Sequence, residues 1–428
     1  MPSTTTPPAV RSRSRRALVG FIVALLAASA SGVAAQGPPA GASVTVSVLT
    51  FGPGEEVFER FGHNAIRVQR PGTGLDVAFN WGMFTFDQPH FIQRFLTGDT
   101  KYWMQGFSGA AFIAEYQAQH REVWEQELAL SASEKDSLVK FLDWNQREEN
   151  RYYRYDYYRD NCSTRVRDAI DGIIGGAIRN TATARAHGVT YRSETLRLAK
   201  AFPELLLGMD FVLGPRADTP SSGWDELFVP MRLRDLLREV RVAGPNGTLV
   251  PLVAREVKLV SDPTYVEAIA PPSMIPAGRR VGMLVAAIFL LAMSRALVRN
   301  VAVRWIVVAI ASAWSLAVGL SGGVLLFAGI FTRHYYMGAN LNLLLATPLS
   351  LAIAIVLPFA LRSVASNRLR SAAVALTSAA AVAAVLGAVI TIAGPLAQLN
   401  GSAVALLLPG HLMLALFVRK TLRKESQT

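Results

Sequence analysis

Five long apolar stretches in the last third of the chain constrain its fold more than any other feature. Each is close to the length of about 20 residues that an α-helix needs to cross a bilayer. We therefore expect an all-α transmembrane domain of about five helices over 279–418. The expected spans are 279–298, 305–330, 341–361, 371–393 and 402–418.

Basic residues are unevenly distributed among the loops that join these spans. The first loop, the third loop and the tail 419–428 are basic, whereas the second and fourth loops share only Arg333. Because positive loops stay on the cytoplasmic side, the tail is expected in the cytoplasm and the N-terminal region outside. The basic residues are Arg295, Arg299, Arg304, Arg362, Arg368, Arg370, Arg419, Lys420, Arg423 and Lys424.

The N-terminus has the composition of a secretory signal peptide. Four arginines precede the apolar stretch 17–29, and small residues follow at 33–35. This order is typical of a signal peptide over 1–35, with an uncleaved anchor helix as the alternative. In either case 36–260 is expected to be an exported domain. A Pro-rich linker, 261–278, would join it to the membrane domain.

The charge of the chain does not indicate a nucleic-acid partner. The formal net charge is +12, but many arginines lie at the N-terminus and between the spans, where they orient the chain in the membrane. The lone cysteine, Cys162, cannot form an intramolecular disulfide, so the fold is not a disulfide scaffold. We expect no metal and no cofactor.

Strand and helix signals alternate in the exported region and predict an α+β domain. A Ser131–Glu134 capping box begins a helix after the strand 121–130. Asp87 is expected to cap a short helix that ends at Gly98, and a hairpin is expected around Pro245-Asn246-Gly247. The remaining predicted elements are strands at 44–50, 64–69 and 76–81, a strand or loop at 151–158, and a helical section at 163–240.

Cys162 stands where a polar loop turns into a predicted helix. Asp160 or Asn161 can cap that helix, which would place Cys162 in its first turn. There the helix dipole and the free N–H groups favour a thiolate and can hold an oxyanion. The sequence therefore predicts a nucleophilic thiol, with a buried, inert cysteine as the alternative.

A nucleophilic thiol needs a base, and histidine is the best candidate. His63 follows Phe61-Gly62 and opens a predicted strand, so a strand-edge imidazole would face a helix-start thiol in a permuted papain-type order. The alternative for His63 is a turn histidine with its hydrogen bonds satisfied. The other histidines of the domain, which have no such placement, are His90, His120 and His187.

Several segments resemble the Lnb-type bacterial lipoprotein N-acyltransferases, and the resemblance covers most of the chain beyond the signal peptide. The most specific part is the Asp-Asn-Cys helix start with an upstream Gly-His. More distantly, the chain is similar to permuted NlpC-type enzymes and to the lecithin:retinol acyltransferase group. The segments are 61–65 (FGHNA), 79–84 (FNWGMF), 153–167 (YRYDYYRDNCSTRVR), 223–230 (GWDELFVP), 332–334 (TRH), 340–344 (NLNLL) and Pro348.

The resemblance implies an enzyme of the bacterial inner membrane, with its catalytic domain 36–260 in the periplasm, that transfers an acyl chain through a Cys162 thioester. The donor would be a membrane phospholipid, and the acceptor would be the lipidated N-terminal cysteine of a lipoprotein. His63 would act as the base, because its pKa suits proton transfer near neutral pH.

Further residues are expected to support this pair. An amide can fix the tautomer of an imidazole, so Asn80 is the first choice to orient His63 and Asp76 the second. Asp160, Asn161 and Arg165 would support the nucleophile. Polar residues at the outer edge of the third span are candidates for substrate contact, or alternatively for capping and interhelical hydrogen bonds. They are His334, Asn340 and Asn342.

Two other functions compete with acyl transfer. A membrane-anchored NlpC-like cysteine peptidase or amidase would use the same Cys162 and His63 on cell-wall peptides, but it would not need five spans. A non-enzymatic envelope sensor would leave Cys162 unreactive and dispensable.

Overall fold

The computed structural model describes residues 44–185, 188–244, 246–262, 267–294, 300–362, 364–393 and 398–425. The expected signal peptide lies outside the described residues, and so do His187, Pro245, Arg295 and Arg299.

The N-terminal domain is built on a seven-stranded antiparallel sheet with the order β6-β4-β3-β2-β1-β5-β9. Alternate residues of its central strands point to opposite faces, and both faces are buried. The strands are β1 (Thr45–Phe51), β2 (His63–Arg70), β3 (Leu75–Met83), β4 (Lys101–Ser108), β5 (Val123–Leu128), β6 (Tyr152–Arg154) and β9 (Val253–Val260). A separate hairpin is formed by β7 (Arg241–Ala243) and β8 (Leu249–Pro251).

Helices cover both faces of this sheet. On one face, Phe112, Ile113 and Tyr116 of α3 (Gly109–Ala118) pack on β1 residues such as Leu49 and Phe51. On the other face, α4 (Ala132–Asn145), α5 (Cys162–Ile173) and α9 (Pro230–Leu237) share one core with the strands. The remaining helices are α2 (Phe91–Thr97), α6 (Ala177–Thr183), α7 (Tyr191–Leu198) and α8 (Pro203–Val212).

Most of the predicted elements are present, with one displaced helix start. Ser131 and Glu134 form both bonds of the predicted capping box. The short helix α2 begins at Phe91, not after Asp87, and its N-cap is His90 in a left-handed conformation (φ 58°). The expected Asp87 cap is therefore wrong, because Thr85 accepts from Asp87 in a turn that precedes the helix. The strands β4 and β9 and the helix α3 were not predicted.

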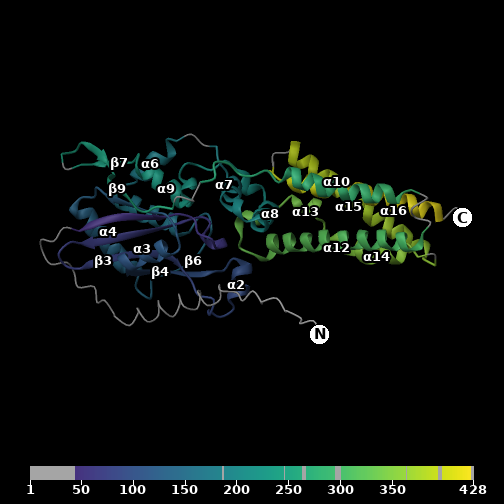
Figure 1. Cartoon of the computed structure of the whole chain (residues 1–428), viewed down its shortest axis with the longest axis horizontal. Helices are drawn as coiled ribbons and strands as arrows, with labels where there is room; N and C mark the ends of the chain where they lie inside the picture. Colours follow the sequence, from purple (N-terminus) through teal and green to yellow (C-terminus); the bar gives the residue numbers. More distant parts are fainter. Residues whose placement is uncertain are drawn as a thin grey trace, which may run out of the picture. The chain divides into compact units, whose positions relative to one another are not determined.

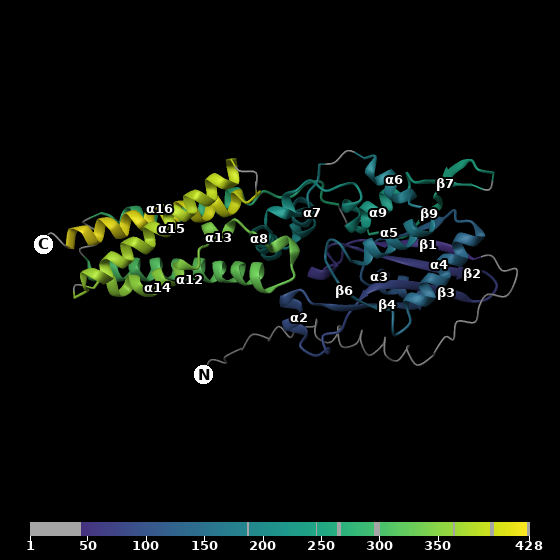
Figure 2. The ribbon, with the colours of Figure 1, turned by 180° about the vertical axis from the view of Figure 1, so that it is seen from behind.

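Among the described residues, the membrane domain contains five helical segments that are long and apolar enough to cross a bilayer, which agrees with the expected number. Figures 1 and 2 show α12, α14, α15 and α16 running alongside one another. The segments comprise α10 (Ile275–Ala292), α12 (Val301–Phe331), α13 (Asn342–Leu345) with α14 (Leu349–Ala360), α15 (Asn367–Ala393) and α16 (Gly401–Glu425).

The third span is broken between α13 and α14. Pro348 cannot donate a backbone hydrogen bond, so a proline here favours an interruption. The chain leaves α13 at Ala346, and α14 begins after Pro348. The backbone between α13 and α14 packs closely against α12 because Gly322 of α12 has no side chain. A Cβ on Gly322 would lie 1.8 Å from the carbonyl oxygen of Ala346.

Candidate active site

Cys162 is the first residue of α5, and its place is fixed by the residue before it. Asn161 is the N-cap: its side-chain oxygen accepts from the Thr164 amide at 2.9 Å. The Asn161 amide group also donates to the carbonyls of Tyr157 and Phe228, both at 2.9 Å. The helix start is therefore held from two sides, and Cys162 is buried in the first turn as the sequence predicts.

Backbone N–H groups converge on the Cys162 sulfur. Burial raises the pKa of the thiol to about 11, while the N–H groups of Asn64, Ser163 and Cys162 itself oppose that rise. The resting thiol is therefore neutral near pH 7. The same N–H groups would stabilise negative charge that develops on sulfur or on an attached oxygen during a reaction.

His63 opens β2, and Asn80 on β3 orients its ring. Asn80 pairs with Ala65, two residues after His63, so the two side chains lie diagonally on one face of the sheet. The His63 Nε2 and the Asn80 Oδ1 are 2.5 Å apart. A carbonyl oxygen only accepts, so Nε2 carries the proton and Nδ1 keeps the lone pair that a base needs.

The surroundings of His63 keep the imidazole neutral. Its ring stacks on Tyr116 and lies near Phe51 and Phe112, with ring centroids between 6.1 and 6.4 Å apart. This burial lowers the pKa of His63 to about 4; the Asn80 hydrogen bond raises it, and the charge of Arg121 lowers it further. The imidazole therefore has a free lone pair at neutral pH, but its pKa lies well below the near-neutral value expected from the residue type.

Arg121 is a site residue that the sequence did not reveal. It is buried, and its guanidinium donates to the Gly52 carbonyl at 2.9 Å and pairs with Glu59 at 3.1 Å. Its charge lowers the pKa of both His63 and Cys162. No motif surrounds Arg121 in the sequence, so only the folded structure identifies it.

His63 and Cys162 both lie beside Gly82, where β3 bulges against β4. A Cβ built on Gly82 would lie 3.8 Å from the His63 Cε1 and 4.0 Å from the Cys162 Cβ. Gly82 has φ +105°, a conformation that L side chains rarely adopt. The bulge therefore brings the imidazole and the thiol beside one unsubstituted backbone position.

The remaining predicted supporting residues have other partners. Asp76 forms a two-point ion pair with Arg67, with both distances 2.7 Å, so its carboxylate is engaged away from His63. Asp160 pairs with Arg165 across the start of α5, and the Arg165 guanidinium lies 4.3 Å from the centroid of the Tyr153 ring.

A row of aromatic rings leads away from Cys162. Burial, followed by the negative charge of a Cys162 thiolate, raises the pKa of Tyr155, so this ring lies within electrostatic range of the thiol. Consecutive ring centroids along the row are 4.4 to 6.1 Å apart. We call it the aromatic row; its members in order are Tyr155, Tyr102, Phe84, Phe91 and Phe95.

The far end of the aromatic row lies against the membrane domain. Phe95 is on α2, and Thr97 of that helix accepts a backbone hydrogen bond from Arg333 at 2.8 Å. Arg333 follows the last residue of α12, Phe331, by two positions. The row therefore runs from the neighbourhood of the thiol to the end of a membrane-spanning helix.

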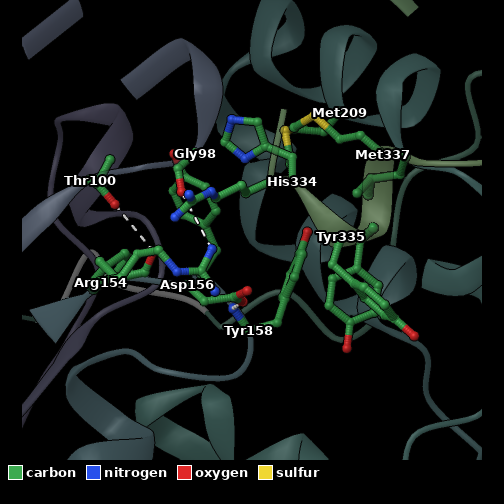
Figure 3. Close-up of a pocket in the computed structure, with 14 residues that line it drawn as sticks. Gly98, Thr100, Arg154, Asp156, Tyr158, Met209, His334, Tyr335 and Met337 are labelled. Carbon is green, nitrogen blue, oxygen red and sulfur yellow. Dashed lines mark hydrogen bonds between the residues drawn. The ribbon is translucent and has the colours of Figure 1, made fainter. Parts of the chain in front are cut away.

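The three polar residues predicted at the edge of the third span have different positions. His334 lies against Phe95 and stacks on Tyr157 at 6.1 Å, so it lines the junction between the two domains (Figure 3). Asn340 and Asn342 are buried, and both amides donate to the Phe211 carbonyl of α8. These two asparagines hold the domains together, which matches the hydrogen-bonding alternative.

The fold and the site define a class of protein. It is a multispan membrane protein with an α+β domain in which a thiol and an imidazole lie beside the same glycine, Gly82. Comparison with known families gives two matches. Residues 39–199 match the Lnb N-terminal periplasmic domain, and residues 281–393 match the Lnb transmembrane domain. The chain belongs to the Lnb family, with a periplasmic domain and a multispan membrane domain. No curated protein and no solved structure matches the chain.

Proposed function

We propose that the protein is an acyltransferase that moves a fatty acyl chain from a membrane phospholipid to the N-terminal amine of bacterial lipoproteins. Cys162 is the nucleophile, His63 the general base and Asn80 the residue that orients His63. Membership of the Lnb family supports this reaction, since both of its domains are matched.

In the first half-reaction, the Cys162 sulfur attacks the ester carbonyl of the phospholipid while His63 Nδ1 takes the thiol proton. The N–H groups of Asn64, Cys162 and Ser163 stabilise the oxyanion. The C–O bond of the ester then breaks, and His63 returns the proton to the leaving oxygen. A lysophospholipid leaves, and the acyl group remains on Cys162 as a thioester.

In the second half-reaction, the lipoprotein amine attacks the thioester. His63 accepts a proton from the attacking nitrogen, a C–N bond forms, and the C–S bond breaks. The Cys162 sulfur leaves with the bonding electrons and regains its proton from His63. An N-acylated lipoprotein and the free thiol result, so one imidazole serves both steps.

The aromatic row is the observation that supports a lipid as the substrate. An acyl chain drawn into water loses about 0.8 kcal/mol per exposed CH₂, so the thiol needs an apolar route to the bilayer. The row supplies such a route from Tyr155 to α2, where Ile92 and Leu96 are 72% and 54% exposed. A peptidase acting on cell-wall peptides has no use for a route of this kind.

A thioester-trapping experiment tests the proposal. The full-length protein in phospholipid vesicles, without an acceptor, should gain the mass of one acyl chain on Cys162, measured on the intact protein. Adding a diacylglyceryl-modified lipopeptide should discharge that mass and yield an N-acylated peptide. Cleavage of cell-wall peptides by the same preparation, with no acyl mass on Cys162, would instead identify the cysteine peptidase.

A further inference from the structure

A cavity lies where the end of α12 adjoins the N-terminal domain. It measures about 390 Å³, and one wall is the last turn of α12 with Ala328, Gly329 and Thr332. Four arginines line it, and we call it the arginine pocket. They are Arg154 on β6, Arg159 before α5, Arg216 after α8, and Arg333.

The charge of the arginine pocket is not balanced by carboxylates. Arg159 pairs with Asp156 at 3.0 Å, and Arg333 pairs with Asp99 at 3.1 Å. Within the described part of the chain, Arg154 and Arg216 have no carboxylate within ion-pair distance. Arg154 instead donates to the Gly98 carbonyl at 3.5 Å, and Arg216 donates to the Tyr335 carbonyl at 3.2 Å. Two guanidiniums therefore keep their charge available for an anion.

The geometry of the side chains suits a tetrahedral anion. The guanidiniums of Arg159 and Arg216 each lie 4.4 Å from the centroid of the Tyr335 ring, so one aromatic ring holds both. A planar guanidinium can donate two parallel hydrogen bonds to phosphate oxygens. Several such groups around one cavity are the arrangement expected for a phosphate.

The position of the pocket indicates where that phosphate comes from. Ile330 and Phe331, which end α12, are more than 60% exposed, as expected for side chains facing hydrocarbon. The pocket begins within one turn of them, and the end of a membrane-spanning helix is expected at the level of the headgroups. It shares Arg154, Arg333, His334 and Tyr335 with a narrower pocket, drawn in Figure 3. That pocket is also lined by Tyr155, the first ring of the aromatic row.

We propose that the arginine pocket binds the phosphodiester of a glycerophospholipid and so places the acyl donor beside the aromatic row. This assignment rests on the proposed function, because it gives the donor's headgroup a site. The proposal predicts that the protein selects its acyl donor by the phosphate group. The acceptor needs no phosphate, so the arginine pocket should not select it.

Binding can be measured separately from catalysis in the full-length protein carrying Cys162→Ala. Purified in a neutral detergent, it is titrated with phosphatidylglycerol and with diacylglycerol of the same acyl chains. The same titrations follow for Arg154→Gln/Arg216→Gln and for Arg154→Lys/Arg216→Lys. Arg255→Gln is the control, since Arg255 is an exposed arginine of β9 that pairs with Glu127 at 3.2 Å.

The parent should bind phosphatidylglycerol at least about tenfold more tightly than diacylglycerol, as expected for charge-assisted bonds to phosphate. The glutamine pair should lose most of that difference, the lysine pair should keep part of it, and Arg255→Gln should keep all of it. Unchanged phosphatidylglycerol affinity in the glutamine pair would overturn the proposal. Inorganic phosphate that binds as tightly as the lipid would also overturn it, because the site would then be a general anion site.

The thioester assay separates this proposal from the proposed function. Arginine-dependent lipid binding without any acyl mass on Cys162 in the wild type would overturn the acyltransferase and leave the headgroup site standing. Normal thioester formation in the glutamine pair, at the wild-type rate from phosphatidylglycerol, would overturn the headgroup site and leave the acyltransferase standing.

Discussion

The Nε2 of His63 lies 2.5 Å from the Oδ1 of Asn80, on the strand next to it. The Asn80 Nδ2 also donates to the Met83 sulfur at 3.2 Å, which fixes the orientation of the amide. The imidazole is thus held with its proton on Nε2, and Nδ1 is left as the basic nitrogen. In the mechanism that we propose, this hydrogen bond decides which nitrogen accepts the thiol proton.

The first prediction concerns the pair itself. Cys162→Ala and His63→Ala should each lower lipoprotein N-acylation by several orders of magnitude, because neither the nucleophile nor the base can be replaced by its neighbours. Acylation is measured by mass spectrometry of lipoprotein N-termini in cells that carry each variant. Membrane levels of both variants should match the wild type, and near-normal acylation in either would remove that residue from the mechanism.

The second prediction concerns Asn80. Asn80→Ala leaves the His63 N–H without its acceptor, so kcat should fall about 10-fold to 100-fold, in line with the cost of an unsatisfied buried group. Because the Asn80 hydrogen bond raises the pKa of His63, its loss should also move the acid limb of the pH profile downward. Asn80→Asp should move that limb upward. A purely structural Asn80 would change protein yield without moving the limb.

The third prediction is the pH dependence of the wild type. Burial lowers the pKa of His63 to about 4, so the base becomes protonated and activity is lost only as the pH falls toward 4. The rate of thioester formation from the phospholipid should therefore stay nearly constant between about pH 5.5 and 8, rather than halving near the ordinary histidine pKa of about 6.5. It is measured without an acceptor, because the amine of a lipopeptide titrates near pH 8 itself. An acid limb centred near 6.5 would contradict the prediction.

Much of the fold could be predicted because periodicity and capping are local. The five spans, the strands around His63 and Asn80, and the Ser131 capping box are each set by residues within one segment. The start of α2 was misplaced because Asp87 has the residue type of a cap, whereas His90 occupies the N-cap position through a left-handed backbone conformation. The strand β9 was missed because its pairing with β5 joins segments more than a hundred residues apart.

The site was predictable only in part, for the same reason. Cys162 at a helix start and His63 at a strand edge carry local signals. Arg121 acts on both through space from the start of β5, and Tyr155 is one of several tyrosines in its run. The excess positive charge of the arginine pocket depends on which arginines form ion pairs with carboxylates in the folded chain. No sequence pattern specifies those pairs.

The fourth prediction concerns Gly82. An alanine there must adopt φ +105° and would place a methyl group in van der Waals contact with His63 and Cys162. Gly82→Ala should cost about 1–3 kcal/mol of unfolding free energy, and the backbone shift that relieves this strain should lower activity by displacing His63 or Cys162. Gly72→Ala is a matched control, since Gly72 has φ +83° and open space around it. Thermal melts should show comparable losses for both variants, and acyl transfer should suffer only in Gly82→Ala; equal activities would contradict a role for this position in the site.

The fifth prediction tests whether α2 carries the aromatic row into the lipid. Ile92 and Leu96 are exposed in the N-terminal domain, yet Thr97 of the same helix is bonded to Arg333 at the end of α12. If these side chains enter the bilayer, each contributes about 1.5–3 kcal/mol of apolar burial, and charges placed there would expel the helix. Ile92→Asp/Leu96→Asp should therefore raise the KM for a donor embedded in vesicles by at least about tenfold.

The choice of donor separates this effect from damage to the site. A short-chain phospholipid that dissolves as a monomer needs no membrane contact by α2, so its kcat and KM should be nearly unchanged in Ile92→Asp/Leu96→Asp. Leu249→Asp is the control, because Leu249 is a comparably exposed leucine (69%) on the β7–β8 hairpin. An equal loss of activity with the soluble and the vesicle-embedded donor would mean that the substitutions impair the reaction at Cys162 and His63. In that case α2 would have no part in reaching the lipid.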